Sequence, residues 1–347
     1  MTPTLTTTGK AALAQILDEA AVHLPGLGMV VTSVDGVLFK HYAGKVDVLD
    51  PQSPTFDEHT IQFFASTTKL LTSVAILQLI DNLEYGLTLD SPASLHLPQL
   101  ATPLRIFQGL DEHGAAIYGS TNTEITLQMM LNQTSGFGAE FASEVVAWKS
   151  TLKAGEKGAG FVNSCKIDNL IHTPIVSEPG TVYQYGNSAD LESYMQEHVF
   201  MPLGMTSTSY LPFEGELAKR LMPLRWWNED LKRYEVLSDQ FPGLTLPRVI
   251  SEIEYPVGGG GIFSNPSDYS LLLRHLLISY KANTASSVLK LSATTIESLF
   301  KPTLPLEARK GLNAMIGTVY EAEEVGDLDW TTGMCFFGKE KRGGWGR

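Results

Sequence analysis

The stretch that decides the fold is residues 65–80, which read ASTTKLLTSVAILQLI. Its opening matches the pattern Ser-x-x-Lys, and residues three apart on a helix share a face, so the Ser66 hydroxyl is expected near the Lys69 amine. Residues 70–80 carry no charge, and a helix that is apolar nearly all round belongs in a protein interior. The sequence therefore predicts a long buried helix from residue 66 to about residue 83. Ser66 would lie at its N-terminus, where free N–H groups favour developing negative charge.

The four-residue pattern is weak by itself, because it occurs elsewhere in the chain, for example at residues 150–153 (STLK) and 287–290 (SVLK). Both of these segments have surroundings typical of exposed loops. A purely structural interpretation of the first occurrence also stays open. In that interpretation Ser66 or a neighbouring threonine caps a core helix while Lys69 reaches out to water. A partner from elsewhere in the chain is needed to choose between the two interpretations.

That partner is predicted at Tyr185-Gly186-Asn187, the one Tyr-x-Asn sequence in the chain. It follows the turn Glu178-Pro179-Gly180 and precedes a helical pattern that Ser188 can cap, so Tyr185 is expected on a loop with rigid flanks. Burial would lower the pKa of Lys69, the ammonium form of Lys69 would lower the pKa of the Tyr185 phenol, and the two groups would share a proton. The alternative is an ordinary buried tyrosine beside a helix cap.

The remaining sequence predicts an α+β protein. A helix and a β-hairpin open the chain, a largely helical middle follows, and two strands close it. The expected bounds are residues 11–24 for the helix, 29–34 and 37–40 for the hairpin strands around the turn Asp35-Gly36, 125–280 for the helical middle, and 314–320 and 334–337 for the last strands. Both ends of the chain are expected to close one antiparallel sheet, with the helical part as a second lobe and a small-molecule cleft between the lobes.

Five segments resemble, in order, those of one superfamily. They are residues 65–73 (ASTTKLLTS), 131–138 (LNQTSGFG), 179–187 (PGTVYQYGN), 202–208 (PLGMTST) and 258–264 (GGGGIFS). Over about residues 10–310 the chain resembles the serine β-lactamase and penicillin-binding-protein superfamily, and in particular class C-like esterases and the fungal transesterases of polyketide metabolism. Gln133 replaces the histidine of the superfamily's Leu-x-His-Thr-Ser-Gly pattern.

The resemblance implies a β-lactamase/transpeptidase-like fold, an antiparallel sheet flanked by helices with a mostly helical second lobe. Residues 1–347 would form a single unit, in which residues 1–65 and 256–347 make the α/β lobe and residues 66–255 the helical lobe. The superfamily normally supplies further strands and a final helix after the point where this sequence stops. The C-terminal strands of the sheet are therefore expected to be truncated.

The resemblance also implies a chemistry. Ser66 would attack an acyl carbonyl, Lys69 and Tyr185 would accept and return the proton, and Asn187 would hydrogen-bond Lys69 or the substrate. The acyl group would pass from Ser66 to an alcohol, a thiol or water. The expected function is an acyltransferase acting on a small or medium ester or thioester in secondary-metabolite biosynthesis. The alternatives are a serine esterase of the same fold and a truncated, catalytically silent relative.

The predicted oxyanion hole is where the sequence departs from the superfamily pattern. The superfamily takes one N–H donor from the nucleophile and another from a late strand that follows Lys-Thr-Gly or Trp-Gly-Gly. No Lys-Thr-Gly occurs, and the nearest candidates are Lys341-Arg342-Gly343 and Trp345-Gly346-Arg347. Trp345 and Gly346 are therefore expected to form a substrate-binding wall, with a frayed basic tail as the alternative.

Composition narrows the partners. The 347 residues carry a formal net charge of -13 at pH 7, which would repel nucleic acid and anionic membranes. No run of about 18 apolar residues and no signal peptide occurs, so a cytoplasmic protein is expected. Metal-ligand spacings and a dinucleotide fingerprint are missing, and Cys165 and Cys335 fit no CxxC pattern, so no metal or cofactor is expected. The expected partners are a small-molecule acyl donor and acceptor, the acyl group being free or bound to a carrier protein.

Overall fold

The computed structural model describes residues 4–161, 164–185, 192–237, 251, 253–254, 257–320, 328–337 and 342–344. Within these ranges the helices are α1 (Thr7–Ala20), α2 (Thr68–Asp81), α3 (Leu127–Leu131), α4 (Ser143–Lys149), α5 (Ile167–Ile171), α6 (Glu192–Met195), α7 (Met201–Leu203), α8 (Gly215–Ala218), α9 (Pro266–Ala282), α10 (Ala293–Ser298) and α11 (Leu306–Tyr320). The strands are β1 (Leu27–Ser33), β2 (Gly36–Ala43), β3 (Gln62–Phe63), β4 (Leu104–Leu110), β5 (Ala116–Thr121), β6 (Arg225–Asn228), β7 (Arg233–Val236), β8 (Phe263–Ser264), β9 (Leu328–Trp330), β10 (Cys335–Phe337) and β11 (Arg342–Gly344).

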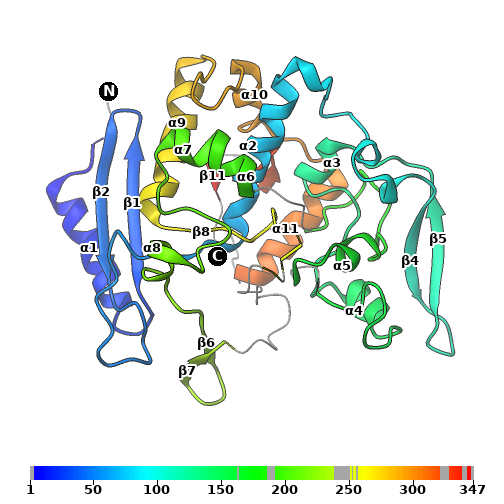
Figure 1. Ribbon diagram of the computed structural model, residues 1–347, viewed down its shortest axis with the longest axis horizontal. Coiled ribbons are helices and arrows are strands. Elements are labelled where there is room, and N and C mark those ends of the chain that lie inside the picture. Colours follow the sequence, from blue (N-terminus) through cyan, green and yellow to red (C-terminus); the bar gives the residue numbers. More distant parts are fainter. Residues whose placement is uncertain are drawn as a thin grey trace.

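Figure 1 shows α2 near the middle of the molecule. One flank is formed by α1 and the β1–β2 hairpin, and the other by α3, α4, α5 and the β4–β5 hairpin. Because the mixture of helices and small antiparallel sheets extends over both flanks, the predicted α+β class is confirmed. The division into an α/β lobe of residues 1–65 and 256–347 and a helical lobe of residues 66–255 stays a prediction.

The predicted N-terminal hairpin is confirmed, with a turn one residue earlier than expected. β1 and β2 pair antiparallel, and the last pair is Ser33 with Gly36. The turn is therefore made by Val34 and Asp35, while Gly36 begins β2 with a φ of 146°, a value that glycine adopts readily. On the inner side of the hairpin, the Arg274 guanidinium of α9 donates to the Ser33 and Val34 carbonyls at 3.2 and 3.0 Å. These bonds tie α9 to the hairpin.

α2 is buried on all sides, as its uncharged sequence predicts. Ten of its fourteen residues are buried, and its apolar side chains meet those of α6, α9 and α10. The core around it includes Leu70, Leu71, Val74, Met195, Phe200, Leu272, Leu276 and Ile296. Each fully buried leucine contributes roughly 1.5–3 kcal/mol relative to an exposed one. This packing holds the first turn of α2, which carries Lys69, in the protein interior.

Two hairpins were not expected from the sequence. β4 pairs with β5 beside α4, and β6 pairs with β7 within the stretch predicted to be largely helical. The second hairpin is anchored by a half-buried ion pair, in which Arg225 donates to both carboxylate oxygens of Asp47 at 2.9 and 2.5 Å. β6 and β7 have four residues each, which is too short for an alternating pattern to stand out, so the sequence gave little signal for this second hairpin.

The prediction of a strand over residues 314–320 is wrong, because these residues belong to α11. Ala308 and Leu312 are four residues apart and fully buried, and Met315 and Ile316 pack against the same cluster. That spacing places all four side chains on one face of a helix. The strand expected over residues 334–337 is confirmed as β10.

The described strands do not join into the one sheet that the sequence was expected to form. β1 and β2 make a two-stranded sheet, whereas β11, β10 and β9 make a separate three-stranded sheet in that order. Both ends of the chain therefore contribute antiparallel strands, but among the residues that the structure describes these strands pair only with their own neighbours.

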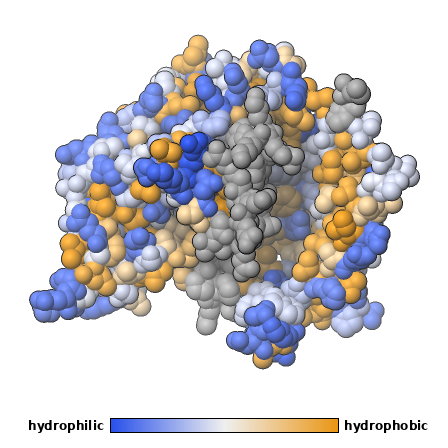
Figure 2. Space-filling view, turned by 180° about the vertical axis from the view of Figure 1, so that it is seen from behind, coloured by the Kyte–Doolittle hydropathy of each residue, from blue (hydrophilic) through white to orange (hydrophobic). Residues whose placement is uncertain are grey.

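The surface mixes polar and apolar side chains. Figure 2 shows the rear face, on which hydrophilic and hydrophobic residues alternate over both flanks of the molecule. Within the described ranges, none of the helices combines the length and the apolar character that crossing a membrane requires.

Candidate active site

Ser66 lies in a 3-10 turn, Ala65–Thr67, that leads directly into α2. Ala65 has a φ of 44°, a left-handed conformation that costs a residue with a side chain roughly 1–2 kcal/mol. The Thr68 hydroxyl donates to the Ala65 carbonyl at 2.5 Å and holds this turn closed. Strained backbone of this kind recurs at functional sites, where the surrounding structure enforces it. The half-buried Ser66 hydroxyl is thereby presented at the entrance of the core helix.

Lys69 lies one turn further along and is buried, with 6% of its surface exposed. Its nitrogen Nζ donates to the main-chain carbonyl of Gly259 at 2.6 Å. Burial lowers the pKa of Lys69 from 10.5 to about 7, because the charged amine loses its hydration. About half of these amines are therefore neutral at pH 7 and able to accept a proton. The alternative in which Lys69 reaches out to water is wrong.

Residues 258–261 form a buried turn against α2. Besides the bond from Lys69, the Thr72 hydroxyl donates to the Gly258 carbonyl at 2.5 Å. A side chain at Gly261 would bring its Cβ within 2.8 Å of the Val257 carbonyl oxygen, a distance that forces a shift of the backbone. Glycine is thus needed for the turn to approach the helix, and a flexible linker is excluded.

Tyr185 reaches Lys69 from a loop that is distant in the sequence. Nζ of Lys69 lies 4.1 Å from the centroid of the Tyr185 ring, a cation–π contact that favours the charged amine. Burial acts in the opposite direction and lowers the pKa of Lys69. The other side of the phenol ring meets the Trp330 ring edge-on, with centroids 6.4 Å apart and an interplanar angle of 82°.

The loop that carries Tyr185 is fastened to the turn after α3 by two main-chain hydrogen bonds. The Gly180 N–H donates to the Thr134 carbonyl at 2.8 Å, and the Gln184 N–H donates to the Gln133 carbonyl at 2.7 Å. Gln133, which stands where the resembled pattern has histidine, is buried and has a φ of 62°. Its carbonyl, rather than its side chain, therefore fixes the residue next to Tyr185.

Glu178 fastens the beginning of the same loop to the end of β5. Its carboxylate accepts hydrogen bonds from the hydroxyls of Thr121, at 2.5 Å, and Thr123. These two donors hold the pKa of Glu178 below its ordinary value. The loop is thus held at its first residue and again immediately before Tyr185.

The structure places the Lys69 amine against the Tyr185 ring, and Ser66 in the turn just before α2, three residues ahead of Lys69. Asn187, Trp345 and Gly346 lie outside the described residues. Sequence reasoning missed two groups of the site, the Gly259 carbonyl and the Trp330 ring. Four consecutive glycines were a usable signal, because such a run permits two backbones to approach closely. Trp330 lies in none of the motifs identified in the sequence, so the sequence gave no signal for its ring.

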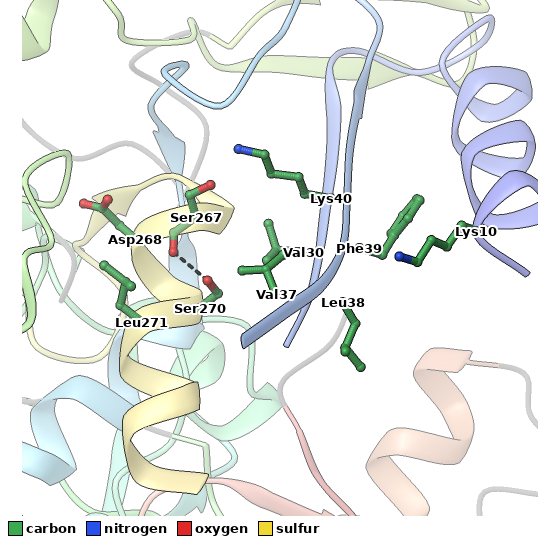
Figure 3. A pocket seen from close by; sticks show the side chains of 10 residues that line it. All are labelled: Lys10, Val30, Val37, Leu38, Phe39, Lys40, Ser267, Asp268, Ser270 and Leu271. Carbon is green, nitrogen blue, oxygen red and sulfur yellow. Dashed lines mark hydrogen bonds between the residues drawn. The ribbon is translucent and has the colours of Figure 1, made fainter. Parts of the chain in front are cut away.

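A separate cavity of about 540 Å³ lies between the β1–β2 hairpin and α9 (Figure 3). Part of its polar lining is already engaged. The Ser267 and Tyr42 hydroxyls are hydrogen-bonded at 2.8 Å, the Ser270 hydroxyl donates to the Ser267 carbonyl at 2.7 Å, and Lys40 is paired with Glu58. None of its lining residues belongs to the three-residue site. The cavity therefore offers no counterpart of the Ser66 and Lys69 arrangement.

Other reactive groups are scattered. Cys165 and Cys335 are buried, and burial raises the pKa of the Cys165 thiol to about 11, which keeps it protonated. In the described part of the chain, no three His, Cys, Asp or Glu side chains lie close enough together to hold a metal ion. The chemistry of the described residues is therefore concentrated at the start of α2.

Known proteins share both sequence and fold with this chain. The ML-236A carboxylate methylbutanoyltransferase of Penicillium citrinum is 29% identical over 283 residues, which are 76% of this chain and 62% of that protein. The lovastatin esterase of Penicillium rubens is 25% identical over 316 residues, 84% of this chain and 72% of that protein. A simvastatin synthase mutant from Aspergillus terreus superposes with a TM-score of 0.75 at 22% identity, covering 96% of this chain and 82% of that chain, and so shares its fold.

The chain spans 62% of the length of the methylbutanoyltransferase that it matches. A sequence model described as Beta-lactamase matches residues 13–321, a span that includes Ser66, Lys69 and Tyr185. Since this match extends over most of the chain and the solved relative shares its fold, the protein belongs to the Beta-lactamase family.

Proposed function

We propose that this protein is a serine acyltransferase that works through an acyl-enzyme at Ser66. The observation that carries the proposal is the buried Lys69 amine, held at 2.6 Å from the Gly259 carbonyl and against the Tyr185 ring, one helical turn from a serine on a strained turn. A hydroxyl becomes a competent nucleophile when a positioned base takes its proton. An amine that is half neutral at pH 7 meets that requirement.

The lowered pKa of Lys69 supplies a large part of the activation. A lysine with an ordinary pKa is neutral in about one molecule in a thousand at pH 7, a handicap of about 5 kcal/mol for a base. A pKa of about 7 removes most of this handicap before any substrate binds. The packing of α2 produces this lower pKa, because the core side chains that bury Lys69 also exclude water from it.

The reaction proceeds in two balanced steps. The Ser66 oxygen bonds to the acyl carbon of an ester or thioester, the bond to the leaving alcohol or thiol breaks, and the proton of Ser66 passes through Lys69 and Tyr185 to that leaving group. In the second step an acceptor alcohol attacks the acyl-enzyme and gives up its proton along the same route. The products are a new ester and the regenerated serine hydroxyl.

The substrate is a small or medium ester or thioester of secondary metabolism, and the acyl group arrives either free or bound to a carrier protein. The Penicillium citrinum relative is a methylbutanoyltransferase, and this similarity supports a short, branched acyl group as the one transferred here. Asn187 is the proposed hydrogen-bond partner of Lys69 or of the substrate, and Trp345 and Gly346 form the proposed wall beside the oxyanion. A cytoplasmic location completes the proposal.

Hydrolysis by the same acyl-enzyme is the second candidate function. The lovastatin esterase of Penicillium rubens aligns with 84% of this chain, and an esterase differs from a transferase only in using water as the acceptor. Because both activities share the first step, the acceptor has to be identified separately from the nucleophile.

The first experiment identifies the nucleophile by intact-protein mass spectrometry after incubation with a fluorophosphonate. We expect one adduct on the wild-type protein and none on the S66A variant. S150A and S287A are matched controls, because each removes the serine of another Ser-x-x-Lys segment, and both should be labelled like the wild type. No adduct on folded wild-type protein would instead support a catalytically silent relative.

The second experiment identifies the acceptor. The protein is incubated with a short-chain acyl thioester in the presence and absence of an alcohol, and the products are separated by chromatography. Formation of the new ester in preference to the free acid supports the transferase. Free acid alone, at every alcohol concentration, supports the esterase.

A further inference from the structure

We propose that Trp330 is a positioning residue, which holds Tyr185 against Lys69 from the far side of the site. This inference rests on the proposed function, since it assigns a task to a residue that does not touch Ser66. Trp330 lies on β9 and is buried, with 2% of its surface exposed. It combines a ring contact with Tyr185, a hydrogen bond from its indole and hydrogen bonds to its main chain.

The indole fixes the turn to which the Tyr185 loop is fastened. Its Nε1–H donates to the Leu131 carbonyl, the last residue of α3, at 3.2 Å. Gln133 and Thr134, which follow directly, accept the main-chain hydrogen bonds from the Tyr185 loop. A single side chain on β9 therefore sets the position of the turn on which that loop rests.

The ring of Trp330 also limits how Tyr185 can move. It meets Tyr185 edge-on at 6.4 Å and Tyr183 at 5.3 Å with an interplanar angle of 51°. Tyr183 is itself buried in the same cluster, and Tyr185 is partly buried and packs against that cluster. Lys69 closes the remaining side of the Tyr185 ring, with Nζ at 4.1 Å from its centroid.

The main chain of Trp330 is also linked by hydrogen bonds to the turn after α3. Its carbonyl accepts hydrogen bonds from the Thr303 N–H and the Thr303 hydroxyl, both at 2.8 Å. The Asn132 side-chain amide donates to that hydroxyl at 3.3 Å and its carbonyl oxygen accepts from the Thr134 hydroxyl at 2.7 Å. Indole and main chain thus reach the turn by separate hydrogen bonds, so the position of the ring is defined twice.

The consequence for Lys69 is the exclusion of water. The titratable groups near this corner include three phenols: Tyr185 over the amine, Tyr183 against the Trp330 ring, and Tyr269 bonded to the Thr67 carbonyl. Asp329, next to Trp330 on β9, is paired with Arg309. Cys335 lies beside Tyr183. Burial is what lowers the pKa of Lys69, so a displaced Tyr185 ring that admits water moves this pKa upward, towards 10.5.

The test is the pH dependence of fluorophosphonate labelling at Ser66 in the W330F variant. Phenylalanine keeps an aromatic ring but removes the N–H that binds Leu131. We expect the midpoint of the labelling rate to move upward by about one pH unit, so that labelling slows about tenfold near pH 6 and approaches the wild-type rate near pH 10. Circular dichroism shows whether the variant is folded.

The matched control is W148F. Trp148 is also 2% exposed, and its Nε1–H also donates a hydrogen bond, at 2.8 Å to the Tyr118 hydroxyl, but it lies on α4. Its replacement by phenylalanine also removes one indole hydrogen bond and should leave the labelling midpoint unchanged. An unchanged midpoint in folded W330F overturns the positioning role, and so does an equal shift in both variants.

A milder variant covers the case in which W330F does not fold. T303V keeps the shape of residue 303 but removes the hydroxyl that links Asn132 to the Trp330 carbonyl. We expect a smaller upward shift of the same midpoint, and no shift overturns the proposal. If the wild-type protein is not labelled at Ser66 at any pH, the proposed function fails first, which is a different result from labelling with an unaltered profile.

Discussion

The segments 66–69 and 287–290 have the same Ser-x-x-Lys pattern and opposite environments. Lys69 is buried against a main-chain carbonyl, and its pKa falls to about 7. Lys290 and Ser287 are both exposed, as are Ser150 and Lys153 of another copy. The difference shows that the pattern supplies only adjacency. The uncharged residues after Lys69 place α2 in the core, and the burial of Lys69 with that helix lowers its pKa.

The largest expected effect comes from removing the base. K69M should lower the rate of acyl-enzyme formation by roughly a thousandfold, within the range expected for a general base. Initial rates with an acyl thioester measure the loss, and K290M, which changes the same residue type in the exposed copy, should stay within about twofold of the wild type. If K69M kept a tenth of the activity, Lys69 would not be the base.

K69M and K290M should also differ in how the free energy of unfolding depends on pH. The unfolded chain holds the Lys69 proton up to pH 10.5 but the folded chain only up to about 7, so the unfolded state binds more protons between these values. The stability of the wild type therefore rises relative to K69M, by at most about 1.4 kcal/mol per pH unit, as pH increases from 7 towards 10.5. Urea unfolding at pH 7, 8 and 9 measures the slope. K290M should run parallel to the wild type, and a K69M curve that also does so would show that Lys69 is not desolvated.

Removing the phenol hydroxyl separates its chemistry from its packing. Y185F keeps the ring between Lys69 and Trp330, so the protein should fold normally and label at Ser66 about tenfold more slowly, in proportion to the loss of one proton-transfer partner. Y42F is the control, because the Tyr42 hydroxyl bonds Ser267 in the hairpin region. Equal rates for Y185F and the wild type would reduce Tyr185 to a packing role.

The smallest effect is expected from relaxing the turn before the nucleophile. A65G removes the side chain from a residue with a φ of 44° and should raise the free energy of unfolding by about 1 kcal/mol. Thermal unfolding measures this gain. Labelling at Ser66 should not increase, since the strain serves to present the hydroxyl. A loss of stability would mean that the Ala65 methyl group contributes more by packing than its conformation costs.

The sequence was sufficient for the features that depend on local pattern. The uncharged run after Lys69 predicted the buried helix, and Asp35-Gly36 predicted the hairpin to within one residue. It was insufficient where the outcome depends on tertiary contacts. The strand predicted over residues 314–320 became the end of α11, because β-branched residues there were outweighed by the burial of Ala308 and Leu312 on one helical face.

The site shows the same limit. Ser66, Lys69 and Tyr185 could be predicted because each lies in a motif with its own spacing. The acceptor of the Lys69 bond is a main-chain oxygen, which every residue possesses, so the glycine run indicates a close backbone approach but not which oxygen accepts. The position of Trp330 depends on how β9 packs across the turn after α3, a contact between segments far apart in the chain.

That main-chain acceptor has a consequence for how this protein can change. A carboxylate side chain in this place would gain and lose charge with pH, and a single substitution could remove it. The Gly259 main-chain oxygen carries no titratable charge and is not removed by a side-chain substitution. It can accept a hydrogen bond from the lysine whether the amine is neutral or charged, so Lys69 keeps the same anchor in both protonation states. Side-chain substitutions elsewhere around Lys69 would not remove this acceptor, because it belongs to the main chain.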